Sequence, residues 1–350
     1  MFPSKTTDVQ SREIPTSRTV GSMTSTFGTL MLVFVAVILV ACGAEKRGDD
    51  AIDPSKAACR AVLKGRGSPI FNLAWSPDGR TLASSGFGPV IRLWEPGTGR
   101  LSSLEGGTEQ PRFVLAWAPQ GRELIVGGLD VTVEAWDVDA GRRVVAGGWT
   151  GNRSAEVREL AGSRRGGTVR LWGPTDCRAS VLPPLARSSN SLALAPGGRS
   201  VASGGADGIL TIWDLESGRE VRSFRGDRGS INSVAFSPDS SKVAAGGFGP
   251  VSVWDTVSGR ELARVGDARG GSATFAFSPD GRSLAIAFWD GSIRIWELST
   301  GRERARLRGH DGQVLALAWA PEGKRLASGG YDSAVRVWDV GSAVEACSVD

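Results

Sequence analysis

The stretch FAFSPDGRSLAIAFWDGSIRIWELSTGR, residues 275–302, contains the pattern that decides the fold. A short apolar run leads into the turn sequence Ser-Pro-Asp-Gly, and a second apolar run follows it. After the turn Asp290-Gly291 comes an alternating segment that ends in Trp296, which is typical of a half-buried strand. The stretch therefore predicts three strands joined by tight turns. One feature needs an explanation: Trp289, a large apolar residue, directly precedes a turn that usually has small or polar neighbours.

The same pattern recurs along the chain. It is clearest in LAWSPDGRTLASSGFGPVIRLWEPGTGR (73–100), VAFSPDSSKVAAGGFGPVSVWDTVSGR (234–260) and LAWAPEGKRLASGGYDSAVRVWDV (317–340). The tryptophans that end the alternating strands are Trp94, Trp136, Trp172, Trp213, Trp254, Trp296 and Trp338, spaced 36 to 42 residues apart. A repeat of about 40–45 residues with four short strands is the signature of a propeller blade.

These motifs resemble the WD-repeat family over residues 58 to about 340. The Trp-Asp pair of that family matches at Trp136-Asp137, Trp213-Asp214, Trp254-Asp255 and Trp338-Asp339, and Trp-Glu replaces it at Trp94-Glu95 and Trp296-Glu297. The resemblance implies an all-β, seven-bladed β-propeller of four-stranded antiparallel blades over residues 58–350, and we expect it to be monomeric. Blade 3, about residues 149–182, lacks the Pro-Asp-Gly turn, so we expect it to be degenerate.

Closing such a ring needs one more strand. The segment ACRAVLKG (58–65) resembles the outer strand RERARLRG (302–309), and the family commonly lends its N-terminal segment to the last blade. The tail 343–350 aligns with the same outer strand. This alignment places Cys59 and Cys347 two positions apart, which is compatible with a disulfide, whereas two separate buried thiols are the alternative.

The first 45 residues form a targeting segment. Residues 30–41, LMLVFVAVILVA, are continuously apolar but too short for a good membrane span. The following LVAC (39–42) resembles the bacterial lipobox, which implies a signal peptide over 1–41, lipid attachment at Cys42 and a flexible tether over 42–57. An uncleaved anchor helix is the alternative. Either interpretation predicts export, with the domain held on the periplasmic or surface side of a bacterial membrane.

The composition excludes several functions. The 350 residues carry a net charge of only +4, and the basic residues form no run or stripe, so a nucleic-acid partner is not supported. One His and four scattered Cys make no metal cluster, and no phosphate-binding loop is present in the sequence, so we expect no cofactor.

The single histidine has a structural role by resemblance. In many WD-repeat proteins a buried His, a Ser or Thr, an Asp and the strand Trp form a hydrogen-bonded tetrad. In this chain only the last repeat matches it fully, at His310, Ser328, Asp332 and Trp338. A His–Asp catalytic interpretation is weak because no nucleophile motif accompanies the pair.

The question raised by Trp289 is answered by its equivalents in the other repeats. The residues directly before the corresponding turns include Phe87, Leu129, Arg165, Phe248, Trp289 and Tyr331. In the family these turns open where partners commonly dock, and aromatic and Arg side chains dominate binding hot spots. They predict a partner-binding surface, although the rings could instead fold back and cover the neighbouring blade.

Two classes of function follow. The first is a non-enzymatic scaffold, tethered outside the membrane, that binds protein partners through these turns. The second is an exported propeller enzyme or small-ligand binder with its site at the central channel, which the scarcity of His disfavours.

Overall fold

The computed structural model describes residues 58–64, 68–105, 112–128, 133–144, 160–164, 168–172, 179–181, 189–226, 229–266 and 271–340. All regular structure in these ranges is β-strand, and the strands form seven antiparallel sheets. Six sheets have four strands and one has three. We number the sheets in chain order.

Each sheet is built from strands that are consecutive in sequence. Sheet 1 contains β2 (Ile70–Trp75), β3 (Leu82–Gly86), β4 (Ile91–Glu95) and β5 (Arg100–Leu104). Sheet 2 contains β6 (Arg112–Trp117), β7 (Glu123–Gly128), β8 (Val133–Asp137) and β9 (Arg142–Val144). Sheet 3 contains β10 (Leu160–Arg164), β11 (Thr168–Trp172) and β12 (Ala179–Val181). Sheet 4 contains β13 (Ser189–Leu194), β14 (Ser200–Gly205), β15 (Ile209–Asp214) and β16 (Glu220–Arg225).

The remaining sheets follow the same order, with one exception. Sheet 5 contains β17 (Ile231–Phe236), β18 (Lys242–Gly247), β19 (Val251–Asp255) and β20 (Glu261–Val265). Sheet 6 contains β21 (Ser272–Phe277), β22 (Ser283–Phe288), β23 (Ile293–Glu297) and β24 (Arg302–Leu307). Sheet 7 contains β25 (Val314–Trp319), β26 (Arg325–Gly330) and β27 (Ala334–Asp339), and its fourth strand is β1 (Ala58–Lys64) from the other end of the chain.

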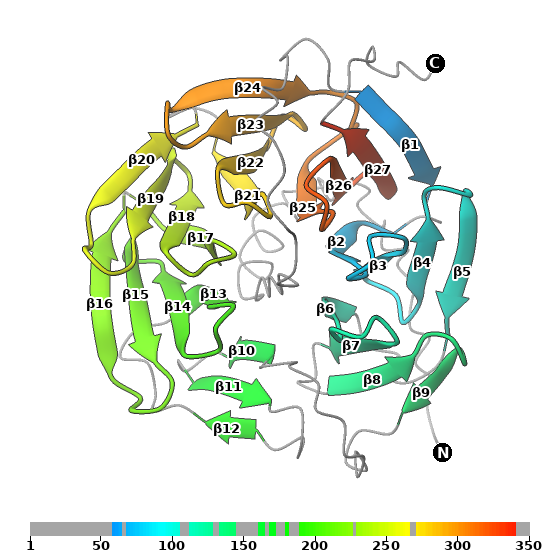
Figure 1. Ribbon diagram of the computed structural model, residues 1–350, viewed down its shortest axis with the longest axis horizontal. Helices are drawn as coiled ribbons and strands as arrows, with labels where there is room; N and C mark the ends of the chain where they lie inside the picture. The colour runs from blue at the N-terminus through cyan, green and yellow to red at the C-terminus, as the bar shows by residue number, and fades with distance from the viewer. Residues whose placement is uncertain are drawn as a thin grey trace, which may run out of the picture. The chain divides into compact units, whose positions relative to one another are not determined.

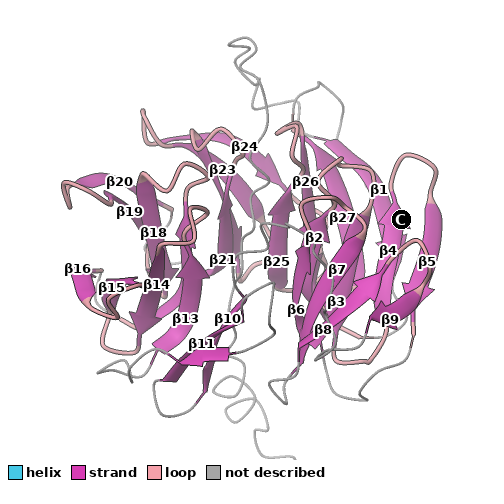
Figure 2. Cartoon of the chain, turned by 60° about the horizontal axis from the view of Figure 1, so that its bottom comes forward, coloured by secondary structure: helices cyan, strands magenta, loops and turns pink. Residues whose placement is uncertain are grey.

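The sheets lie around a central axis (Figure 1). The innermost strands of the four-stranded sheets are β2, β6, β13, β17, β21 and β25. Neighbouring sheets face each other around this axis, as the tilted view shows (Figure 2). Buried apolar clusters form between neighbouring sheets. One joins sheets 4 and 5, and others join sheets 5 and 6, 6 and 7, 7 and 1, and 1 and 2. A single sheet would expose both of its faces to solvent, so the stacking of neighbouring sheets is what buries these faces.

These findings confirm the all-β class and the β-propeller architecture. They also confirm that the N-terminal segment completes the last sheet, because β1 pairs with β27 and Cys59 lies opposite Trp338. Sheet 3 shows three strands among the described residues. The complete blade count and the domain limits at 58 and 350 stay predictions.

Several predictions concern residues outside the described ranges. These are the signal peptide, Cys42, the tether, Leu129, Arg165 and Cys347. The disulfide between Cys59 and Cys347 therefore stays a prediction. Within the described ranges, no helix is long and apolar enough to cross a membrane.

Candidate partner-binding surface

Four of the predicted turn residues are described, and each lies between the second and third strands of its sheet. Phe87 follows β3, Phe248 follows β18, Trp289 follows β22 and Tyr331 follows β26. We call these four residues the turn aromatics. Their exposed fractions are 44%, 52%, 47% and 43% respectively, so about half of each side chain faces solvent.

The turn aromatics of sheets 5 and 6 contact each other edge to face. The ring centroids of Phe248 and Trp289 are 5.2 Å apart with an interplanar angle of 70°. Trp289 also covers the backbone of Gly271, since a Cβ placed there would lie 3.6 Å from the indole. The buried half of this pair therefore packs across the boundary between the two sheets, in an arrangement that aromatic pairs favour.

A second aromatic group joins sheets 7 and 1. Phe71, on β2, packs against Phe87 with centroids 4.6 Å apart and against Tyr331 with centroids 6.5 Å apart. Burial raises the pKa of the Tyr331 hydroxyl, which agrees with a partly covered ring. Phe71 was missed by the sequence analysis because it lies on an innermost strand, not at a turn.

The packing of Trp289 agrees with the interpretation that its ring covers the neighbouring blade, and the partner-binding interpretation stays a prediction. Phe248, Trp289 and Tyr331 each contact an aromatic ring of a neighbouring sheet, whereas Phe87 contacts Phe71 of its own sheet, and all four side chains are partly exposed. Such packing restricts the rotamers that each ring can adopt.

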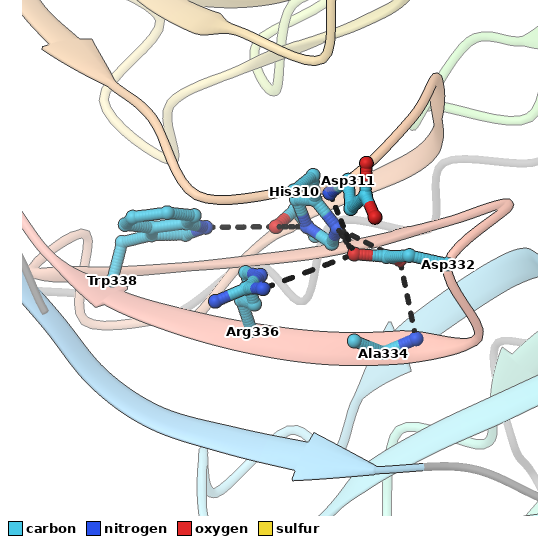
Figure 3. A network of polar contacts seen from close by, with 7 residues as sticks. His310, Asp311, Asp332, Ala334, Arg336 and Trp338 are labelled. Carbon is cyan, nitrogen blue, oxygen red and sulfur yellow. Dashed lines mark hydrogen bonds and ion pairs between the residues drawn. The ribbon is translucent and has the colours of Figure 1, made fainter. Parts of the chain in front are cut away.

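A polar network around Asp332 holds the turn after β26 in place (Figure 3). Asp332 accepts hydrogen bonds from His310 Nδ1 at 2.8 Å, from the backbone N–H of Asp311 at 3.2 Å and from that of Ala334 at 3.2 Å. Arg336 Nη2 lies 3.9 Å from the same carboxylate. The turn after β26 is thus tied to the loop that precedes β25.

The four predicted tetrad residues are brought together in this network. His310 Nε2 lies 2.6 Å from Ser328 Oγ, and Trp338 Nε1 donates to that oxygen at 2.7 Å. One proton assignment pairs every group: the Ser328 hydroxyl donates to Nε2, and Nδ1–H donates to Asp332.

The electrostatics of Asp332 reflect competing effects. Burial raises the pKa of this carboxyl, but the hydrogen bond and charge of His310 and the two backbone N–H groups lower it by more. The pKa of Asp332 therefore lies below its ordinary value.

The Ser328–His310–Asp332 chain has the contacts of a hydrolytic triad but no access to substrate. The side chain of His310 and the whole of Ser328 are 0% exposed. The serine oxygen already accepts the indole N–H of Trp338. A nucleophile must reach a substrate carbonyl, so this network is structural. Among the described residues no group of His, Cys, Asp or Glu could hold a metal ion.

The equivalent tryptophans of other sheets keep only part of the network. Trp94 donates to Ser84 at 2.8 Å and Trp213 donates to Ser203 at 2.9 Å, with no histidine in either sheet. Trp136 donates to Glu134 at 3.3 Å. The Nε1 of Trp296 is buried without a hydrogen-bond partner. Three sheets besides the last therefore keep a polar partner for the indole.

Comparison with known proteins agrees with this architecture. The WD40 family model, described as "WD domain, G-beta repeat", matches residues 57–95, 187–214, 218–255, 271–297 and 301–339. The chain is a WD40 repeat protein with five matched repeats.

The curated relatives include three eukaryotic proteins. The chain is 27% identical over 177 residues to "Meiotic recombination protein rec14" of Schizosaccharomyces pombe, covering 50% of this chain and 47% of that protein. It is 39% identical over 74 residues to "U3 snoRNP-associated protein-like YAOH" of Oryza sativa subsp. japonica, covering 19% of this chain and 14% of that protein. It is 35% identical over 74 residues to "Small ribosomal subunit protein RACK1y" of the same plant, covering 21% of each. The matches span less than half the length of these relatives.

Proposed function

We propose that this protein is a non-enzymatic scaffold that binds protein partners through the turn aromatics. The observation that carries the proposal is their repetition: four sheets place a large aromatic residue at the same turn, each about half exposed. A solvated rim has no need of such side chains. Aromatic residues in partly buried, preformed positions are enriched among binding hot spots, and clustered exposed apolar surface marks interfaces.

Two further observations support a scaffold. The only histidine of the chain is occupied in a buried hydrogen-bond network. WD40 repeat proteins also typically serve in protein interactions, which favours the same class of function. We further propose that the complete ring has seven blades, with sheet 3 as its degenerate member.

The location of the scaffold is a separate proposal that rests on the sequence alone. The lipobox-like LVAC motif supports lipid attachment at Cys42 after removal of residues 1–41, with residues 42–57 as a tether to a bacterial membrane. In a lipoprotein-processing host, Cys42→Ala should leave the protein unprocessed or release it from the membrane fraction. A variant that stays in the membrane at unchanged size would support an uncleaved anchor helix instead.

Site-specific photocrosslinking tests the binding proposal. A photoreactive residue at Asp311, which is exposed beside Tyr331's turn, should form an adduct with a partner in intact cells. The same residue at Val257, which is 81% exposed on a turn between the third and fourth strands, is the matched control. Equal adducts at both positions would contradict the proposed surface. Loss of the Asp311 adduct on adding a small molecule would favour a ligand binder.

A further inference from the structure

Sheets 7 and 1 meet where the two ends of the domain come together. β1 closes sheet 7 from outside by pairing with β27. Its Val62 packs against the apolar cluster between sheets 6 and 7. The cluster between sheets 7 and 1 draws instead on β2, β3 and β4 from one side and on β25, β26 and β27 and the turn after β25 from the other. Val62 is the only β1 side chain that the structure describes, and it lies at the boundary between sheets 6 and 7 rather than at this seam.

Two side chains bridge the same seam with polar contacts. Trp75, at the end of β2 and 8% exposed, donates its indole N–H to the carbonyl of Ala318 on β25 at 3.1 Å. Arg325, at the start of β26, donates from Nη2 to the carbonyl of Gly79 at 2.8 Å. Its guanidinium carbon also lies 4.6 Å from the centre of the Trp75 ring. We call this group the seam clasp.

The arginine of the clasp is held in place from its own sheet. Arg325 Nε pairs with Glu322, and the arginine side chain is only 19% exposed. The fit is close, because a Cβ added to Gly79 would lie 2.9 Å from Glu322 Oε2 and 3.2 Å from Arg325 Nη2. Gly79 also has a φ of +67°, a conformation that favours glycine. Partly desolvated cation–π contacts and charged hydrogen bonds are stronger than their exposed counterparts.

The neighbouring boundaries have only half of this arrangement. Trp319 donates to Ala276 at 3.1 Å between sheets 7 and 6, and Trp117 donates to Ala74 at 3.0 Å between sheets 2 and 1. At the position of Arg325, sheet 6 has Ser283 and sheet 1 has Thr81. The arginine is therefore absent at the two boundaries next to the seam, whereas sheet 5 has a lysine, Lys242, at the same position.

We propose that the seam clasp keeps the propeller closed independently of β1, so that β1 is a detachable strand. When β1 leaves β27, sheets 7 and 1 stay docked through their apolar cluster, Trp75 and Arg325. The outer edge of β27 then becomes open while the ring, and with it the turn aromatics, keeps its shape.

Amide hydrogen exchange of the full chain tests this inference. Val62→Pro weakens β1, because proline cannot donate to the strand ladder. Exchange in β1 and in the β27 amides that face it should rise, while β2 and β26 stay within about twofold of the parent. Adding Arg325→Ala should then raise exchange in β2 and β26 about tenfold or more. Adding Thr81→Ala, at the equivalent position of sheet 1, should not.

Three outcomes would overturn the inference. If Val62→Pro alone fails to fold, or exposes β2 and β26, the ring depends on β1. If the Val62→Pro/Arg325→Ala chain keeps the parent's protection in β2 and β26, the clasp does not hold the seam. If Thr81→Ala has the same effect as Arg325→Ala, the arginine has no special role there.

Discussion

Replacing Ser328 by alanine removes the centre of the buried network in the last sheet. The Ser328 hydroxyl is 0% exposed and connects two groups: it accepts from Trp338 at 2.7 Å and lies 2.6 Å from His310 Nε2. Without it, the indole N–H and the imidazole nitrogen are both buried without a partner. Each unpaired group costs about 1–3 kcal/mol, so we expect Ser328→Ala to lower the free energy of unfolding by roughly 2–5 kcal/mol.

The chain supplies matched controls for this variant. Ser84 and Ser203 occupy the equivalent place in sheets 1 and 4, where each accepts from one tryptophan and no histidine is present. Ser84→Ala and Ser203→Ala leave one unpaired indole N–H each, so we expect about 1–3 kcal/mol. The unpaired Nε1 of Trp296 shows that the fold tolerates one such group.

Urea unfolding of the three variants, followed by circular dichroism, measures the differences. Ser328→Ala should lose the most stability with an unchanged denaturant slope. In the double variant with His310→Leu the two losses should not add, because each single variant already breaks the contact between Ser328 and His310. Equal losses in all three serine variants would refute the reasoning, since the histidine would then contribute nothing through Ser328.

Two other predictions concern acid stability and backbone contacts. The pKa of Asp332 is lowered in the folded state, so its contribution to stability is present above the ordinary Asp pKa of about 3.9 and is lost as the pH falls through the lower folded value. Asp332→Asn removes this contribution. Melting curves at a series of pH values should therefore show a smaller loss of stability on acidification for the variant than for the parent. Gly247→Ala would put a Cβ 2.0 Å from the carbonyl oxygen of Ser230 and should cost about 3 kcal/mol or more, whereas Gly97→Ala, with nothing within 4 Å, should change stability by less than about 0.5 kcal/mol. Equal melting temperatures for the two glycine variants would contradict the close packing at the end of β18.

The repeating part of the fold could be predicted from the sequence because it depends on local signals. Pro-Asp-Gly turns, alternating strands and a regular tryptophan spacing each act over a few residues, and their repetition identifies the architecture. The pairing of β1 with β27 followed from its likeness to an equivalent strand, residues 302–309. The hydrogen bonds of the His310 network followed from the family resemblance in the same way.

The contacts between sheets could not be predicted, because they depend on register. In six sheets the pairing of the first and second strands contains a register shift, such as the one between Ile70 and Asn72. A bulge changes which side chains face which way, and alternation in the sequence does not show it. The packing of Phe71 between Phe87 and Tyr331 depends on such a shift, and Trp75 reads in the sequence as an ordinary core residue.

The affinity of the turn aromatics for a captured partner tests the central claim most directly. With the partner identified by crosslinking at Asp311, its dissociation constant should be measured for the parent, Trp289→Ala, Tyr331→Ala and Leu101→Ala. Leu101 is 49% exposed on the outer strand β5 and serves as the control. We expect each aromatic variant to lose about 2 kcal/mol of binding free energy, roughly 30-fold in affinity, with a nearly unchanged melting temperature, and Leu101→Ala to bind like the parent. Aromatic variants that melt earlier yet bind the partner with parental affinity would show that these rings are structural and that the partner binds elsewhere.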